Sequence, residues 1–279
     1  MAMTIWNAVL LGLVQGIAEI LPISGSGHLT LVNNLFKLSD VTEGHMLFVA
    51  LLRLSTLIAI CVVYWQELRA MYYELLSLAN LGPYAGQERD RYAAARVFFM
   101  LLVATVPLFL ILPVNDRLQK LGERNVFIGV MLLLSGAVLY TADKMTPRKK
   151  NAGSMTVLDA LLIGLCQCVA AIPGLSRSGT TITAGIATGL KRDFAVHFSL
   201  LLCLPSLFGA SILAFGDAVS QRIDWTCVPA YLVGTAVALA SAIGAIHLLR
   251  SIAAKGRFGG FAYYCWVVGV LTIILYLIF

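Results

Sequence analysis

Three ionisable side chains, Glu19, His28 and Arg177, lie inside or directly beside apolar stretches of this 279-residue chain. Charges at membrane depth are costly, so such residues are functional candidates by default. The planar guanidinium of Arg177 suits the oxygens of a phosphate. Glu19 can hold a divalent cation or act as a general base, and His28 can transfer protons or attack phosphorus directly. This set of groups predicts phosphoryl-transfer chemistry, which depends mostly on positioning and charge neutralisation.

The charged residues belong to a motif that occurs once in each half of the chain. In both copies an apolar run breaks at proline and continues into Ser-X-Ser-Gly. The copies span residues 12–28 and 164–180 and align without a gap at a constant offset of 152 residues (164 − 12). The pattern indicates a duplicated functional element whose two copies carry different charges.

Small and hydroxyl-bearing residues surround these charges. Glycines allow close backbone approach to a ligand, and hydroxyls with the amides of a helix N-terminus form an anion cradle. Gln15 shares a helix face with Glu19, and these two are the expected cation ligands. A second arginine lies seven residues into an apolar run and either reaches the membrane surface or adds charge to the same cavity. The expected substrate-binding residues are Ser24, Ser26, Gly27, Arg53, Gly174, Ser176, Ser178, Gly179 and Thr181.

Structural roles for the same residues remain open at this point. Glu19 and Arg177 can form a purely structural ion pair, or they can pair and separate in alternate states of one cycle. His28 follows a Gly-rich turn and is expected to open the next helix, where it can also serve as a hydrogen-bonding residue at the helix end.

The composition predicts a polytopic membrane protein. The chain is 59% hydrophobic and 12% charged, whereas a soluble globule needs about a quarter charged residues. The net charge of +6 does not indicate a nucleic-acid partner, because the basic residues lie in short loops between apolar spans and no zinc-finger spacing is present. The six cysteines are expected to be core thiols.

Six stretches are apolar and long enough for a full crossing, which needs about 20 residues: 46–66, 93–114, 126–143, 194–216, 227–249 and 261–279. The two motif segments are not continuous crossings, because a proline and a Ser/Gly-rich turn interrupt each apolar run. The run at 5–21 resumes at 28–38, and the run at 156–172 resumes at 180–190. Broken backbone at membrane depth must be buried in protein or line a wet cavity. We therefore predict two re-entrant helical hairpins in an all-α membrane protein.

Each half then holds one hairpin and three crossings, residues 1–150 in the first unit and 151–279 in the second, which together form one membrane domain. An odd number of crossings makes the second unit enter from the opposite face, which is an inverted-topology repeat with its site near the midplane. Basic loops such as 144–150 are expected to be cytoplasmic, so both termini and the mouth of the first hairpin are expected on the external side.

These residues resemble the signatures of the undecaprenyl-pyrophosphate phosphatase family, also known for bacitracin resistance. The first signature, Glu/Gln-x-x-x-Glu followed by Pro-x-Ser-x-x-Gly-His, is matched by residues 15–19 and 22–28. The second, Pro-Gly-x-Ser-Arg-Ser-Gly-x-Thr, is matched in full by 173–181. Residues 198–205 and 261–264 resemble further family segments, so the similarity spans nearly the whole chain.

The resemblance implies a bacterial inner-membrane enzyme that removes the terminal phosphate of undecaprenyl pyrophosphate on the external face. This reaction regenerates the carrier lipid for peptidoglycan and other envelope polysaccharides. The resemblance also implies a divalent cation, Mg2+ or Ca2+. The expected partners are a polyprenyl pyrophosphate lipid and the bilayer, without nucleic acid, and the candidate assembly is a homodimer.

The chain departs from the family pattern at Gly25, where relatives usually have a serine that is often proposed as the nucleophile. Without that hydroxyl, the attacking group is His28, Ser24 or Ser26, or a water activated by Glu19 and a metal, and we favour His28 or the activated water.

Three further departures are Val49 for a glutamate, Arg53 for a glutamine and Cys265 for an arginine. The alternative function is a polyprenyl-phosphate flippase or transporter with weak or no hydrolysis.

Overall fold

The computed structural model describes residues 3–38, 44–81, 93–122, 124–220 and 224–278. These residues are helical and contain no strand, and only a single bridge joins Lys150 to Leu190. Six segments of this part are long and apolar enough to cross a membrane, which confirms the number expected from the sequence. They are Met46–Val63 (α4), Ala93–Leu110 (α6 with η2), Asn125–Lys144 (α8), Arg192–Val219 (within α11), Trp225–Lys255 (η4 with α12) and Gly259–Ile278 (α13).

The described residues between α4 and α8 form shorter helices. α5 (Trp65–Leu78) follows α4 directly. α6 itself ends at Thr105, and the chain continues through the 3-10 turns η2 (Val106–Leu110) and η3 (Leu112–Val114) into α7 (Asn115–Leu121). Pro107 has no amide hydrogen and cannot continue the α-helical ladder, so the apolar run expected as one crossing ends in tighter turns.

Each copy of the repeated motif folds as a helix, a short break and a second helix. The pairs are α1 (Ile5–Ile20) with α2 (Gly25–Leu35), and α9 (Val157–Val169) with α10 (Arg177–Ala187). At 1.5 Å per residue the longest of these helices measures about 24 Å, whereas the hydrocarbon core is about 30 Å thick. None of the four helices therefore crosses a bilayer on its own.

The second helix of each pair begins three residues earlier than expected from the sequence. Ser24 caps α2 by accepting a hydrogen bond from the Gly27 amide, and Ser176 caps α10 through the Gly179 amide. The expectation that His28 opens the returning helix is therefore wrong. A serine cap lets the following small residues join the first helical turn, which apolar periodicity cannot reveal.

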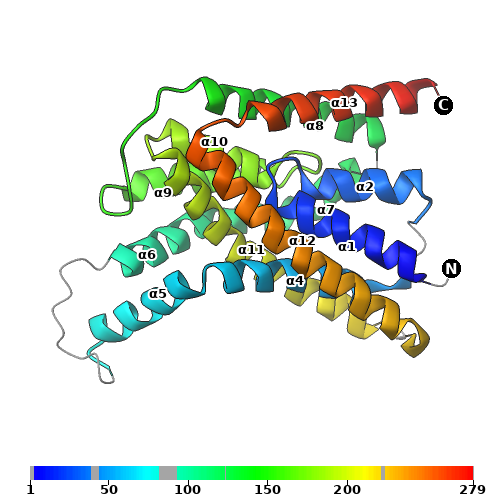
Figure 1. Ribbon diagram of the computed structural model, residues 1–279, viewed down its shortest axis with the longest axis horizontal. Coiled ribbons are helices and arrows are strands. Elements are labelled where there is room, and N and C mark those ends of the chain that lie inside the picture. The colour runs from blue at the N-terminus through cyan, green and yellow to red at the C-terminus, as the bar shows by residue number, and fades with distance from the viewer. Residues whose placement is uncertain (1–2, 39–43, 82–92, 123, 221–223, 279) are drawn as a thin grey trace.

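The first helix of each motif packs on the other half of the chain. α1 lies along α12 (Val228–Lys255), and α9 lies along α6 (Figure 1). A side chain at Gly12 would collide with the carbonyl of Gly234, and one at Gly164 would collide with the carbonyl of Ala104. Two glycines at the same place in the motif thus permit equivalent close crossings.

Two long helix pairs complete the bundle. α4 packs on α11 (Arg192–Ser220), and α13 runs beside α8 (Figure 1). Both ends of the chain lie at one end of the molecule, whereas the α8–α9 connection and the α12–α13 turn lie at the opposite end (Figure 1). The basic residues of these two connections are thus gathered away from the termini, as the orientation argument requires.

Candidate active site

The two motif breaks meet inside the bundle at an ion pair. The Nη2 of Arg177, the first residue of α10, donates to Oε1 of Glu19 in the last turn of α1 at 2.8 Å. The two side chains are 22% and 19% exposed. The structure therefore brings together the two charges that the sequence places 158 residues apart.

Hydrogen bonds join the two breaks on either side of this pair. The Gly174 amide donates to the Ser26 hydroxyl at 3.4 Å, and the Ser178 hydroxyl donates to the Leu21 carbonyl at 3.2 Å. Each break thus uses its serines to hold the backbone of the other. The contacts fix the position of both helix N-termini, whose first amides lack acceptors within the helix and favour an anion.

Ser135 of α8 supports the second break from behind. Its Oγ accepts a hydrogen bond from the Ser176 amide at 2.9 Å and lies 3.3 Å from the Gly174 carbonyl, to which it can donate. Gly174 has φ +88, and a side chain there would also meet Met131 at 2.8 Å. Glycine is therefore required at this position both by backbone conformation and by space.

Ser24 adopts a strained backbone conformation at the first break. Its φ is 77 and its ψ is 92, which is uncommon for a residue with a side chain. Strain of this kind costs energy and persists where neighbouring contacts hold it, most often at functional sites. Here the Ser24 cap of α2 and its carbonyl contact with His28 supply those contacts.

A cavity of about 560 Å³ opens beside the ion pair. Its walls come from α1, α2, α4, α7, α10, α11 and the second break. The predicted site residues among them are Gln15, Glu19, Ser26, Arg53, Ser176, Arg177 and Ser178. The two motif copies and α4 thus contribute polar groups to one space.

The other predicted site residues lie behind this wall. Ser24 and Gly27 form the cap of α2, and Gly179 belongs to the cap of α10. Thr181 contacts the Ser199 hydroxyl of α11 at 2.6 Å and bonds the Arg177 carbonyl at 2.9 Å. In this conformation these residues hold the cavity wall in place.

His28 is turned away from the cavity and toward α13. Its Nδ1 lies 2.9 Å from the Ser24 carbonyl, which can only accept, so Nδ1 carries the proton. Its Nε2 lies 2.9 Å from the Tyr264 hydroxyl, and the two rings stack at 5.6 Å. In the neutral imidazole, Nε2 is thus the acceptor of the Tyr264 hydroxyl, so its lone pair is engaged.

Gly25 lies against the free oxygen of Glu19 and lines the cavity. A Cβ at this position would be 2.6 Å from Glu19 Oε2 and 3.2 Å from the Ala18 carbonyl oxygen. A carbon atom cannot approach an oxygen this closely, so the Glu19 carboxylate occupies the space that a side chain at position 25 would need. Glycine therefore lets the carboxylate pack against the start of α2, where both residues line the cavity.

Arg53 lies within the apolar helix α4 and also faces the cavity. Its Nη1 donates to the Ala210 carbonyl of α11 at 3.2 Å. It forms no ion pair with a carboxylate of the described residues. Of the two expectations for this arginine, the cavity position is the one observed.

The donor set suits a divalent cation that binds together with substrate. No group of three or more His, Cys, Asp or Glu side chains that could hold a metal occurs in the described ranges. Glu19 Oε2 is free of Arg177, and Gln15, whose amide nitrogen lies 3.5 Å from the Thr56 hydroxyl, can offer its carbonyl oxygen. Mg2+ is commonly held by one or two such ligands, substrate phosphates and waters.

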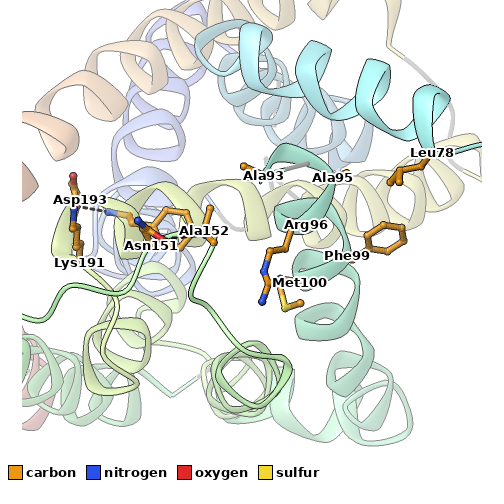
Figure 2. Close-up of a pocket in the computed structure, with 12 residues that line it drawn as sticks. Leu78, Ala93, Ala95, Arg96, Phe99, Met100, Asn151, Ala152, Lys191 and Asp193 are labelled. Carbon is orange, nitrogen blue, oxygen red and sulfur yellow. Dashed lines mark hydrogen bonds between the residues drawn. The ribbon is translucent and has the colours of Figure 1, made fainter. Parts of the chain in front are cut away.

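A larger cavity of about 910 Å³ lies elsewhere, between α6, the turn at 151–153 and the start of α11 (Figure 2). Arg96 and Met100 of α6 form one side, and Asn151, Ala152 and Lys191 form the other (Figure 2). Arg96 donates to the Met155 carbonyl at 2.8 Å. This cavity contains none of the predicted site residues, so we assign the chemistry to the smaller one.

Sequence reasoning missed several residues that support the site. Ser135 lies in an apolar span, where a single serine carries no signal of its own. Ser199 and Tyr264 lie in the two further segments that resemble the family, 198–205 and 261–264, and that resemblance is the signal that could have found them. Cys203 of α11, taken for a core thiol, is buried beside the Arg177 guanidinium.

Comparison with known proteins connects this geometry to a family. A family model described as "Bacitracin resistance protein BacA" matches residues 8–271. A protein of Desulforapulum autotrophicum named undecaprenyl-diphosphatase is 36% identical over 276 residues, covering 98% of both chains. Proteins of the same name from Pelotomaculum thermopropionicum and Halothermothrix orenii are 35% and 33% identical, with at least 97% of each chain covered.

Proposed function

The chain belongs to the bacitracin resistance protein BacA family, and from this premise we propose that it is an undecaprenyl-diphosphatase. It hydrolyses the lipid diphosphate to the monophosphate carrier lipid and inorganic phosphate. The observation that carries the proposal is the Arg177–Glu19 pair at the cavity where the two motif copies meet. The relatives reported above are named as hydrolases, so the flippase alternative is not favoured.

We also propose that α1–α2 and α9–α10 are re-entrant hairpins of an inverted-topology repeat. Their helices are too short to cross, and the equivalent glycines Gly12 and Gly164 pack each hairpin on the opposite half. The basic connections lie opposite the termini, which supports an inner-membrane orientation with the termini and the cavity mouth on the external side.

In the proposed mechanism the headgroup lies between the two hairpin breaks. Arg177 binds oxygens of the terminal phosphate, with the Ser26 and Ser176 hydroxyls and the first amides of α2 and α10 as further donors. These donors are fixed before substrate arrives, because Ser135 and the contacts between the breaks hold them. Fixed donors stabilise the charge that develops in the transition state.

The attacking group is a water of the cavity that Glu19 and Gly25 line, beside Glu19 Oε2. The water oxygen forms a bond to the terminal phosphorus, and the bond from that phosphorus to the bridging oxygen breaks. Glu19 accepts a proton from the water, and the bridging oxygen leaves with the prenyl monophosphate. His28 holds the first break through its Nδ1 bond to Ser24 and acts as a positioning residue.

A divalent cation, Mg2+ or Ca2+, would be held by Glu19 and Gln15 together with the phosphates of the substrate. When bound, it supplies positive charge that neutralises the phosphate oxygens.

The test is phosphate release by the purified protein from undecaprenyl pyrophosphate, with and without a chelator. We expect cation-dependent release, and loss of at least about a hundredfold in rate for Arg177→Ala because the transition-state charge is no longer neutralised. Arg69→Gln, an exposed arginine of α5, is the matched control. Tight substrate binding without any phosphate release would contradict the proposal.

A further inference from the structure

We propose that Arg53 makes this site selective for a diphosphate headgroup, because it binds the phosphate that is not cleaved while Arg177 binds the terminal one. The inference rests on the proposed function and concerns how the same cavity recognises its substrate.

Arg53 is the only charged residue of α4, a span with a mean hydropathy of 2.5. Among the described residues, Arg53 donates one hydrogen bond, to the Ala210 carbonyl, and pairs with no carboxylate. A guanidinium carries a positive charge and five N–H donors, and in an apolar span one neutral carbonyl satisfies only one of those donors and none of the charge. Because Arg53 lines the cavity, an anion bound there would supply the missing charge.

The two arginines approach the same helix at two levels. The Arg177 guanidinium lies beside the Cys203 thiol of α11, and Arg53 donates to Ala210 of that helix. These two contact residues are about 10 Å apart along the helix axis at 1.5 Å per residue. Leu207, which lies between them, lines the cavity. A headgroup therefore meets one guanidinium at each level.

A diphosphate can contact both levels at once, whereas one phosphate can contact only one. The cavity carboxylate Glu19 is already paired with Arg177. The favourable position for two phosphates is therefore the space between the two arginines, where each phosphate contacts one guanidinium.

The experiment measures how tightly detergent-solubilised protein binds two probes, a non-hydrolysable farnesyl methylenediphosphonate and farnesyl monophosphate. We expect the wild type to prefer the diphosphonate. Arg53→Gln should lose at least about tenfold of that preference, because one charge-assisted contact is removed. Its affinity for the monophosphate should stay within about twofold, since that contact is made by Arg177.

Two further variants make the result specific. Arg53→Lys keeps the charge but loses the planar fork and should retain part of the preference. Arg69→Gln is the exposed arginine control. It should leave unchanged the ratio of the affinity for the diphosphonate to the affinity for the monophosphate. If Arg53→Gln does not fold, the ratio for Arg53→Lys against the wild type tests the proposal.

An equal weakening of both probes, or an unchanged ratio in both Arg53 variants, would overturn the inference. Because the probes are not hydrolysed, the ratio can be measured whether or not the wild type releases phosphate. Failure of the proposed hydrolysis is therefore distinguishable from failure of this inference.

Discussion

Gly25 is the residue at which the proposed chemistry of this chain differs most from that implied by the family resemblance. A serine nucleophile is impossible there, and the Glu19 carboxylate occupies the space that a side chain would need, since a Cβ would lie 2.6 Å from Oε2. His28, the other favoured attacking group, has both ring nitrogens engaged by Ser24 and Tyr264. The geometry at the scale of single residues therefore favours activated water over a covalent intermediate.

Replacing Gly25 by alanine tests this assignment. The new methyl group would collide with the Glu19 carboxylate and displace it from the proposed attacking water. We therefore expect phosphate release to fall by about a hundredfold, or about 2.7 kcal/mol of barrier. Substrate binding, measured with the non-hydrolysable diphosphonate, should change much less.

The matched control for this prediction is Gly244→Ala, because a Cβ at Gly244 in α12 meets nothing within 4 Å. Activity of Gly25→Ala close to that of the control would show that the position of the Glu19 carboxylate does not govern the attack by water.

At the scale of helices, the positions of α2 and α10 depend on capping and on contacts outside the membrane. α9 begins with a capping box between Thr156 and Asp159. The Asp159 carboxylate also accepts a hydrogen bond from Lys150 at 2.9 Å, and the Lys150 backbone bonds Gly189 and Lys191 after α10. One lysine therefore ties the start of α9 to the end of α10.

This tie predicts a stability that depends on pH. Burial alone would raise the pKa of Asp159, but the Thr156 amide and the Lys150 ammonium outweigh it, so the folded-state pKa lies below the ordinary 3.8. A carboxyl with a lowered folded-state pKa stabilises the protein above 3.8 and loses this contribution as the pH falls through the folded-state value.

Asp159→Asn should therefore lower the free energy of unfolding by about 1 kcal/mol at neutral pH, a modest value because Lys150 is partly exposed to solvent. The difference from the wild type should shrink below pH 3.8. Denaturation of the detergent-solubilised proteins at neutral pH and below pH 3.8 measures this difference in unfolding free energy, with Lys150→Met as the partner control. If the difference is equally large in acid, the lost stability comes from the Thr156–Asp159 cap and not from the Lys150–Asp159 charge pair.

At the scale of the whole molecule, the packing supports an architecture in which two similar halves exchange their hairpins. α1 packs on α12 and α9 on α6, so the first helix of each hairpin packs mainly on the other half. The cavity exists only where the two breaks meet, and it takes Glu19 from one half and Arg177 from the other. An isolated half would leave each of these charges without its partner.

The proposed orientation gives a prediction for the intact chain in bacteria. Alkaline phosphatase fused after residue 279 should be active, because this enzyme folds only outside the cytoplasm, and a green fluorescent protein fused there should be dark. The same reporters inserted in the basic α8–α9 connection should give the opposite result. Fluorescence from the C-terminal fusion would reverse the orientation.

Much of the fold was predictable because apolar length and duplication are properties of the sequence itself. The described residues contain the six expected segments that are long and apolar enough to cross a membrane, and the two broken segments occur at the expected motifs. The boundaries of α2 and α10 were not predictable from periodicity, since the Ser24 and Ser176 caps act through local backbone geometry. Pro107 likewise ends α6 earlier than its apolar run does.

For the site, the sequence by itself determined which chemistry is available, because charged residues in apolar runs and a repeated Ser-X-Ser-Gly motif are visible without coordinates. Only the tertiary structure decided which of them share a space. It joins Glu19 to Arg177, turns His28 toward Tyr264, and brings Arg53 into the cavity. The physical reason is that these arrangements depend on how separate helices pack, whereas sequence patterns report only the faces of single helices.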